Sequence, residues 1–342
     1  MNKIPSPIIH RESSFELLRL LSQFYIVLYH LFFMFICKID DDPLYKAIQM
    51  PLHVGVILFV LLSGYFSINA TSKKLLRLLA CFIVYTLPET IFTLTHPQSF
   101  YHAVHSLFLL SYTHFWFVKA YLFLFLVSPM LNLYWRSSSN KQRWFMTCVF
   151  GFVSIYMATT HGDKSMLTGK NLVNFMFLYY VGRLLNLYKE KWQNQRYLTW
   201  ITFYVLLNAA IVVAYLVLNG AGRKMVWALS YPYSSPILLV NSVLLFMIIG
   251  KMHFYSKVVN SLAAASLAIY LIHGCRPYVI GTIGGMTYFL YDNISNGLIL
   301  IGSCMMLTLL ILLFAITIDK LLSPFWNYVD RAGEKIYLKL GY

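Results

Sequence analysis

Charged residues are scarce in this chain. Asp, Glu, Lys and Arg make up 11% of its 342 residues, whereas hydrophobic residues make up 59%. An ordinary soluble protein carries roughly 25% charged residues, and a soluble fold of this length would not hide so much apolar surface. The apolar runs are too long and unbroken for the alternating pattern of an outer-membrane β-barrel. The composition therefore predicts an all-α, polytopic membrane protein, a bundle of transmembrane helices.

Cysteine is also sparse, and no two cysteines have a metal-binding or redox spacing. The five residues are scattered in or beside apolar runs, which indicates neither a disulfide framework nor a zinc site: Cys37, Cys81, Cys148, Cys275 and Cys304. One polar loop is rich in histidine, but its spacing fits no standard metal cluster, so we expect an aromatic-rich interfacial loop and no metal. These histidines are His96, His102, His105 and His114.

Ten apolar segments are long enough to be membrane spans. They cover roughly residues 17–36, 51–70, 75–95, 116–134, 144–160, 171–188, 197–218, 235–250, 259–280 and 297–319. The chain shows no linker, second soluble domain or internal repeat, so residues 1–342 are predicted to form a single membrane domain. Residues 1–15 are polar and do not resemble a cleavable signal peptide. Residues 320–342 form a basic, aromatic tail suited to the anionic inner leaflet.

The distribution of Lys and Arg predicts the orientation. With both termini in the cytoplasm, 19 of the 27 Lys and Arg residues fall inside, and Lys119 and Arg276 lie within or at the edge of spans. Six fall outside: Lys38, Lys46, Lys164, Lys170, Arg223 and Lys224. This bias obeys the positive-inside rule. It also explains the net charge of +15 without a nucleic-acid partner.

The first span carries polar residues on one face, within "ELLRLLSQFYIVLYH". Arg19 and His30 are 11 residues apart, which is about 20° beyond three full helical turns and about 16 Å along the axis. Glu16 lies three residues before Arg19 and can pair with it, and Gln23 falls near the same stripe. Such a stripe must face other helices or a wet cavity, so its ionisable groups are candidate functional residues. The alternative is that Arg19 snorkels to the inner headgroups while His30 sits at the outer interface.

The spacing of Glu16, Arg19 and His30 resembles the signature of the acyltransferase type 3 family, a group of bacterial inner-membrane acyltransferases. Many members have Gly after the Arg, whereas Leu20 stands here. Further ordered matches are "GVILFVLLSGYF", "KKLLRLL", "HFWFVKAYLFLFLVSPML", "FLYYVGRLL" and "SLAIYLIH". Together they cover nearly the whole chain.

The resemblance implies acyl transfer from a thioester to an alcohol, and the residues of the first span suit that chemistry. His30 suits a general base because imidazole titrates near neutral pH, although a structural hydrogen bond to a carbonyl is the alternative. Arg19 stays protonated, so it suits a clamp for a donor phosphate or the thioester carbonyl, with Glu16 orienting it. We expect Ser63 and Gly64 to permit close helix contact, not to act in a Ser–His–Asp triad.

The resemblance also implies the two substrates. The donor is acetyl-coenzyme A, a cytoplasmic polyanion whose phosphates Lys73, Lys74 and Arg77 are placed to bind, though topology alone also explains these cations. The acceptor is a hydroxyl of a cell-surface polysaccharide or its lipid-linked precursor. Candidate acceptor-side residues are His273, Arg276 and Trp116, for which a packing or interfacial role stays open. The resemblance places the protein in a bacterial cytoplasmic membrane, in contact with lipid.

Two alternatives stand beside this reading. A glycan or lipid transporter or flippase would use the same polar face as a path, but it should show helix-breaking Gly or Pro in paired mid-span positions. Pro88 and Pro236 are not obviously paired. A relative using succinyl-coenzyme A would share every motif, since no residue separates acetyl from succinyl. The sequence does not indicate an oligomeric state.

Overall fold

A computed structural model describes residues 12–95, 115–160, 168–275 and 279–339. Within these ranges the chain is helical and has no strand. The first part forms α1 (Ser13–Leu31), the π-helix η1 (Phe32–Ile36), α2 (Cys37–Ile39), α3 (Pro43–Leu52), α4 (Val54–Phe66), α5 (Ser72–Thr95), α7 (Trp116–Ser137) and α8 (Asn140–Thr160). The middle forms α10 (Leu172–Leu187), α11 (Lys189–Gln193), α12 (Tyr197–Val217), α13 (Gly220–Ser230) and α14 (Pro236–Gly250). The last part forms α15 (Lys257–Ala263), α16 (Ser266–Gly274), η3 (Val279–Ile283), α18 (Gly284–Asn293), α19 (Gly297–Leu321) and α20 (Ser323–Lys339).

Each of the ten predicted apolar segments coincides with helix, but the helices differ in length. Six are long and apolar enough to cross a membrane, or seven if the bent α15–α16 pair is one broken span. The helices α10 and α14 are apolar but shorter, and the polar first turn of α8 lowers its hydropathy. The all-helical membrane architecture is therefore confirmed within the described ranges, while the number ten and the side of the termini stay predictions.

The second span begins earlier than its predicted start at residue 51. It runs from Pro43 to Phe66 as α3 followed by α4. The side chain of Asp42 accepts a hydrogen bond from the Leu44 amide, and Pro43 occupies the first helical turn, a favourable combination for starting a helix. Lys46 and Gln49 interrupt the apolar pattern in the first turns of this helix. Hydropathy alone therefore indicates a loop there.

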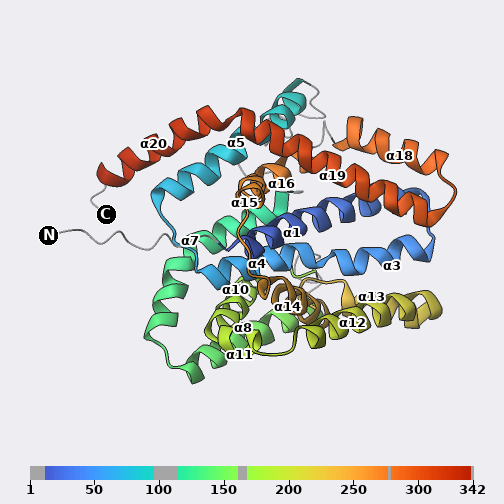
Figure 1. Cartoon of the computed structure of the whole chain (residues 1–342), viewed down its shortest axis with the longest axis horizontal. Helices are drawn as coiled ribbons and strands as arrows, with labels where there is room; N and C mark the ends of the chain where they lie inside the picture. The colour runs from blue at the N-terminus through green and yellow to red at the C-terminus, as the bar shows by residue number, and fades with distance from the viewer. Residues whose placement is uncertain (1–11, 96–114, 161–167, 276–278, 340–342) are drawn as a thin grey trace.

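The centre of the bundle is formed by α1 and α4, which lie in the middle of the molecule with α19 on one side and α10 to α14 on the other (Figure 1). In the Pro43–Phe66 span 78% of the apolar window is buried, against 11% for Tyr197–Val217. The exposed large apolar side chains of α12, such as Leu198 and Val217, suit contact with lipid.

Two glycines let α4 and α10 approach closely. A Cβ atom at Gly64 would lie 2.0 Å from the carbonyl oxygen of Tyr179, and one at Gly182 would lie 2.2 Å from that of Leu61. Each glycine therefore faces the backbone of the other helix, and any side chain would force the helices apart. This confirms the expected packing role of Gly64. Ser63 donates to the carbonyl of Phe59 and to the Tyr121 hydroxyl.

Segments predicted to share a membrane side lie together in the fold. At one end the amide of Ser13 donates to the Phe254 carbonyl, and Lys320 donates to the hydroxyl of Ser261. At the other end Tyr291 donates to Asp40 at 2.9 Å. These connections therefore form two groups at opposite ends of the bundle, as the predicted topology requires. Which group faces the cytoplasm stays a prediction.

Candidate functional site

The N-terminal end of α1, which the topology predicts to be cytoplasmic and which is called the inner end below, carries a closed ion pair. The guanidinium Nη1 of Arg19 lies 2.9 Å and 3.0 Å from the two carboxylate oxygens of Glu16. Glu16 is buried, whereas the Arg19 side chain keeps 28% exposure. This is the pair predicted from their spacing of three residues. The buried carboxylate holds one terminal nitrogen of the guanidinium, Nη1, and leaves the N–H groups of the other two nitrogens available.

Gln23 lies one turn further along the same helix. The residue is 2% exposed, and its amide oxygen has no hydrogen-bond partner among the residues that the structure describes. A buried acceptor left unpaired costs about 1–3 kcal/mol, so such an atom calls for a donor from a water or a ligand. Gln23 therefore marks a polar position between Arg19 and His30, inside the bundle.

The C-terminal end of α1, which the topology predicts to face outward and which is called the outer end below, carries a pair of histidines. Nδ1 of His30 lies 2.9 Å from Nε2 of His273, and the two rings are stacked with centroids 5.1 Å apart. His273 belongs to α16, 243 residues away in sequence. Its own Nδ1 lies 2.7 Å from the carbonyl oxygen of Ile269, one turn back in the helix.

These contacts fix the tautomers of both neutral rings. A carbonyl oxygen only accepts, so Nδ1 of His273 must carry a proton and donate it to Ile269. Nε2 of a neutral His273 is then an acceptor, and His30 must donate to it through Nδ1. The remaining nitrogen of His30, Nε2, holds a free lone pair. The chain thus presents His30 in the form that a general base needs.

A small enclosed cavity of about 30 Å³ adjoins His30. That volume suffices for a water molecule. Aromatic and apolar side chains make up most of its wall: Ile26, Tyr29, Leu52, His53, Val56, Trp116, Tyr233 and Tyr270. The cavity is therefore small and lined mainly by rings and aliphatic groups, and a low local dielectric strengthens the hydrogen bonds beside it.

Four aromatic rings contact one another at this cavity. The hydroxyl groups of Tyr29 and Tyr231 are in hydrogen-bond contact. His53 stacks between Tyr231 and Tyr233, with a centroid distance of 4.2 Å to each, and its Nδ1 donates to the Tyr231 carbonyl at 2.5 Å. Burial raises the pKa of Tyr231, which precedes α14, to about 12. The Tyr231 hydroxyl therefore stays protonated at neutral pH.

Trp116, the predicted acceptor-side residue, lies at the start of α7 and lines the cavity, while its role stays a prediction. Its ring is 5.3 Å from that of Tyr233, and the ammonium of Lys170 lies 5.2 Å from its centroid. Burial lowers the pKa of Lys170, which precedes α10. The structure therefore gathers Trp116, His273 and His30 around one point. Arg276 lies outside the described residues.

The basic cluster of α5 is paired with the C-terminal helix. Lys73 lies 3.6 Å from Glu334, and Arg77 lies 3.3 Å from Asp330. The Arg77 guanidinium also stacks over Trp326 at 4.5 Å. Lys74 is exposed. The tail predicted from residue 320 begins as a helix at Ser323, because α19 continues through Leu321, and it packs along α5 (Figure 1).

Sequence reasoning missed several residues of the site. Tyr29, His53, Tyr231 and Tyr233 were not singled out, although Tyr29 adjoins His30 and "YPYSSP" is an unusual aromatic loop. Within the described residues no disulfide bond joins any of the five cysteines. Within the described ranges no group of three or more His, Cys, Asp or Glu is placed to hold a metal. The four loop histidines, 96–114, lie outside those ranges.

The comparisons with known proteins identify the family of the chain. A family model described as an acyltransferase domain, that of the acyltransferase type 3 family, matches residues 12–318. No curated protein and no solved structure matches the chain. The family match favours an enzyme over a transporter. The match spans nearly all of the chain, from the first turn of α1 to the end of α19, and the chain therefore belongs to the acyltransferase type 3 family and is a membrane acyltransferase.

Proposed function

We propose that this chain is an O-acetyltransferase of a bacterial inner membrane. It moves an acetyl group from cytoplasmic acetyl-coenzyme A to a hydroxyl of a cell-surface polysaccharide or its lipid-linked precursor. One observation carries the proposal: the hydrogen bonds from His30 through His273 to Ile269 leave Nε2 of His30 as a free acceptor. A hydroxyl nucleophile needs such an acceptor at the moment of attack.

The proton and the acyl group follow separate paths in this mechanism. Nε2 of His30 takes the proton of the acceptor hydroxyl while its oxygen attacks the thioester carbonyl carbon. The carbon–sulfur bond of the tetrahedral intermediate then breaks, and the protonated His30 returns the proton to the departing thiolate. His273 accepts from His30 Nδ1 throughout, so it stabilises the imidazolium that forms transiently, as a positioning residue.

The donor enters from the end that holds Arg19. Coenzyme A carries phosphates at one end and the thioester at the end of a long flexible arm. Arg19 suits a phosphate, since Glu16 holds one side of its guanidinium and leaves further N–H groups. The unpaired amide oxygen of Gln23 suits an amide N–H of the arm. About 16 Å of helix separates Arg19 from His30, a distance that the arm bridges.

The donor site also has a basic patch at the end predicted to be cytoplasmic, formed by Lys73, Lys74 and Arg77. Their cations suit the remaining phosphates, but Lys73 and Arg77 already contact Glu334 and Asp330. The donor phosphates therefore compete with α20 for this patch, and Lys74 is the cation that they reach first. The acceptor enters from the opposite end, where Tyr29 and Tyr231 close the cavity.

The test is mass spectrometry of surface polysaccharides from cells that carry the chain, lack it, or carry His30→Ala at matched protein levels. We expect an acetyl mass increment only with the unaltered chain. A succinyl increment would replace the proposed donor, and an increment that survives His30→Ala would overturn the proposed mechanism. The same spectra identify the modified sugar.

The membrane placement has its own test. A reporter fused after Tyr342 should report the cytoplasm, and one inserted at residues 40–42 should report the outside, because the positive-inside rule places Lys and Arg in this way. The opposite pair of results would place the donor and acceptor ends on the wrong sides.

A further inference from the structure

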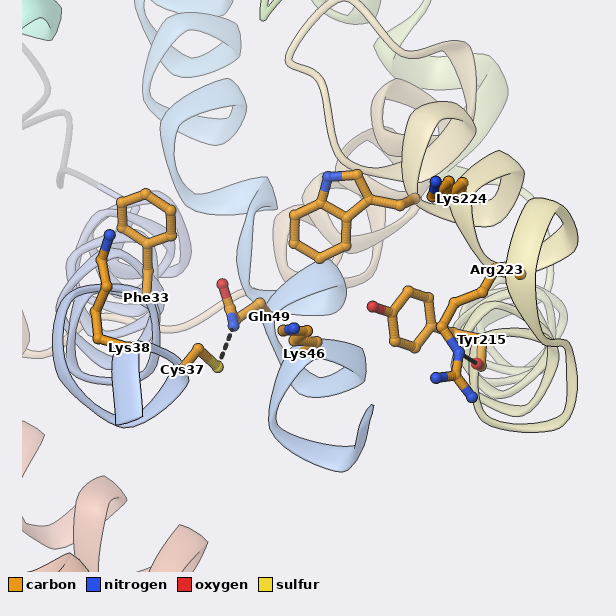
Figure 2. Close-up of a pocket in the computed structure, with 10 residues that line it drawn as sticks. Phe33, Cys37, Lys38, Lys46, Gln49, Tyr215, Arg223 and Lys224 are labelled. Carbon is orange, nitrogen blue, oxygen red and sulfur yellow. Dashed lines mark hydrogen bonds between the residues drawn. The ribbon is translucent and has the colours of Figure 1, made fainter. Parts of the chain in front are cut away.

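The outer end of the molecule carries a cleft of about 470 Å³. It lies between η1 and α2, the start of α3, and the α12–α13 corner. Figure 2 shows Phe33, Cys37 and Lys38 on one side, Tyr215, Arg223 and Lys224 on the other, and Lys46 and Gln49 between them. The volume is in the range of small-molecule binding sites, about 300–1,000 Å³.

Four cations line this cleft, and three carboxylates stand in the connection beside it. Lys46 pairs with Asp41 at 2.5 Å, Asp40 accepts from the Tyr291 hydroxyl, and Asp42 accepts from the Leu44 amide. Among the described residues Arg223 donates to neutral oxygens, the carbonyls at the end of α12 and the side chain of Asn219. Lys38 lies 5.9 Å from the ring centroid of Phe33, and Lys224 is exposed. The cleft therefore holds a surplus of positive charge.

The positive charge of the cleft lies on the predicted outer side of the membrane, where Lys and Arg are not expected. The positive-inside rule disfavours Lys and Arg in short outer connections, and only six fall there in the predicted topology. Four of those six line this one cleft, although they come from segments about 180 positions apart in the sequence. A fifth, Lys170, lies over Trp116 at the His30 cavity. The outer cations are thus gathered along one route, which topology alone does not require.

The cleft adjoins the catalytic cavity through stacked aromatic rings. Trp227, which lines the cleft, stacks on Tyr231 with centroids 3.9 Å apart. Phe33, on the opposite wall, stacks on Tyr29 at 5.3 Å. The hydroxyls of Tyr29 and Tyr231 meet between the cleft and the cavity. Separation of these two rings would join the two spaces.

We propose that the cleft binds an acidic saccharide segment of the acceptor, with carboxylate groups on Lys38, Lys46 and Lys224 and sugar rings against Trp227. This inference rests on the proposed function and names its acceptor class. Charge-assisted hydrogen bonds hold the carboxylates, and the aromatic faces take the apolar faces of the sugar rings. A neighbouring sugar hydroxyl then passes between Tyr29 and Tyr231 to Nε2 of His30.

The test measures binding to the full chain in phosphatidylcholine nanodiscs, with no acyl donor present. The probes are hexameric oligogalacturonate and the neutral maltohexaose, and the variant is Lys38→Gln with Lys46→Gln and Lys224→Gln. Arg223 is left in place because it caps α12. We expect oligogalacturonate to bind, maltohexaose to bind at least about tenfold more weakly, and the variant to lose about tenfold or more for the acidic probe. High salt should weaken the acidic probe further.

A matched control replaces three exposed lysines of the opposite end, Lys141, Lys191 and Lys257, with Gln. It carries the same charge change and should bind oligogalacturonate as the unaltered chain does. Equal affinity for both probes, no binding of oligogalacturonate, or equal loss in the two variants would overturn the proposal. A third arm uses soluble short-chain phosphatidylglycerol. If it binds through the same lysines while the saccharide does not, the cleft serves a lipid headgroup and the proposal is wrong.

Because no acyl donor is present, this result is independent of catalysis. An acetyltransferase with a neutral acceptor would fail here yet still lose activity in His30→Ala. If the chain had no acetyltransferase activity but its cleft served another acidic saccharide, the reverse would be seen. Oligogalacturonate would then bind, while His30→Ala would have no acetyl transfer to remove.

Discussion

The two ends of α1 differ in the charge that they carry. At the inner end a permanent cation, Arg19, is held by the buried carboxylate of Glu16. At the outer end His30 and His273 share one hydrogen bond as neutral rings, with no carboxylate among the contacts that fix their tautomers. A fixed positive charge suits the capture of an anionic donor, whereas a neutral imidazole suits the acceptance of a proton. In the proposed mechanism one helix therefore separates donor binding from proton transfer by about 16 Å.

The variant with the largest expected effect on this difference between the two ends is His30→Ala. It removes the side chain proposed to accept the proton, so turnover should fall on the order of 10²–10⁴-fold. Coenzyme A binding should survive, since Arg19 is three turns away. Turnover and donor affinity are measured separately in membranes with matched protein levels. His253→Ala, an exposed ring near Glu12, serves as the control, and near-normal transfer by His30→Ala would refute the catalytic role.

The next variant tests whether His273 acts through His30. His273→Ala leaves the buried Nδ1–H of His30 without an acceptor, at a cost of about 1–3 kcal/mol. Turnover should fall on the order of 10- to 100-fold, while the KM for the donor stays constant. His273→Gln restores an acceptor oxygen near His30 and should recover part of the turnover. A rise in donor KM, or no recovery with Gln, would reduce His273 to a packing residue.

The inner end of α1 was predictable from the sequence because its contacts are local. Glu16 and Arg19 are three residues apart, and any α-helix brings such residues together. The close contact at Gly64 was likewise predictable, since small residues mark tight helix pairs in membranes. The positions of the ten helical segments followed from hydropathy alone. Their exact starts did not, as the hidden beginning of α3 shows, because a cap and a proline outweighed two polar side chains.

The outer end was less predictable because its contacts join distant segments. His30 meets His273 across 243 residues, and the wall around them adds Tyr231 and His53 from two further helices or loops. No periodicity links such positions. The pairing of Lys73 and Arg77 with α20 was hidden for the same reason: the sequence shows the cations of α5, but only the fold brings Asp330 and Glu334 to them.

Arg19→Lys sharpens the inner half of the comparison. The variant keeps the positive charge but loses the planar fork that contacts Glu16 and a phosphate together. Donor affinity should fall about tenfold, and turnover at saturating donor should change little. Arg136→Lys, an exposed substitution at the end of α7, is the matched control. A snorkelling Arg19 would tolerate Lys fully, so equal donor affinity in the two variants would favour that alternative.

The smallest expected effect concerns the pairing of α5 with α20. Replacing Lys73, Lys74 and Arg77 with Gln should weaken coenzyme A binding, and replacing Asp330 with Asn and Glu334 with Gln should strengthen it, because the donor then meets uncompensated cations. Each change should be only a few-fold, since exposed ion pairs contribute about 0–1 kcal/mol, and both should shrink at high salt. Glu190→Gln removes an exposed carboxylate of α11 and should leave affinity unchanged. If both sets of variants bind coenzyme A as the unaltered chain does, these cations determine topology only. The donor phosphates would then depend on Arg19, and the inner end of α1 would hold the whole anion site.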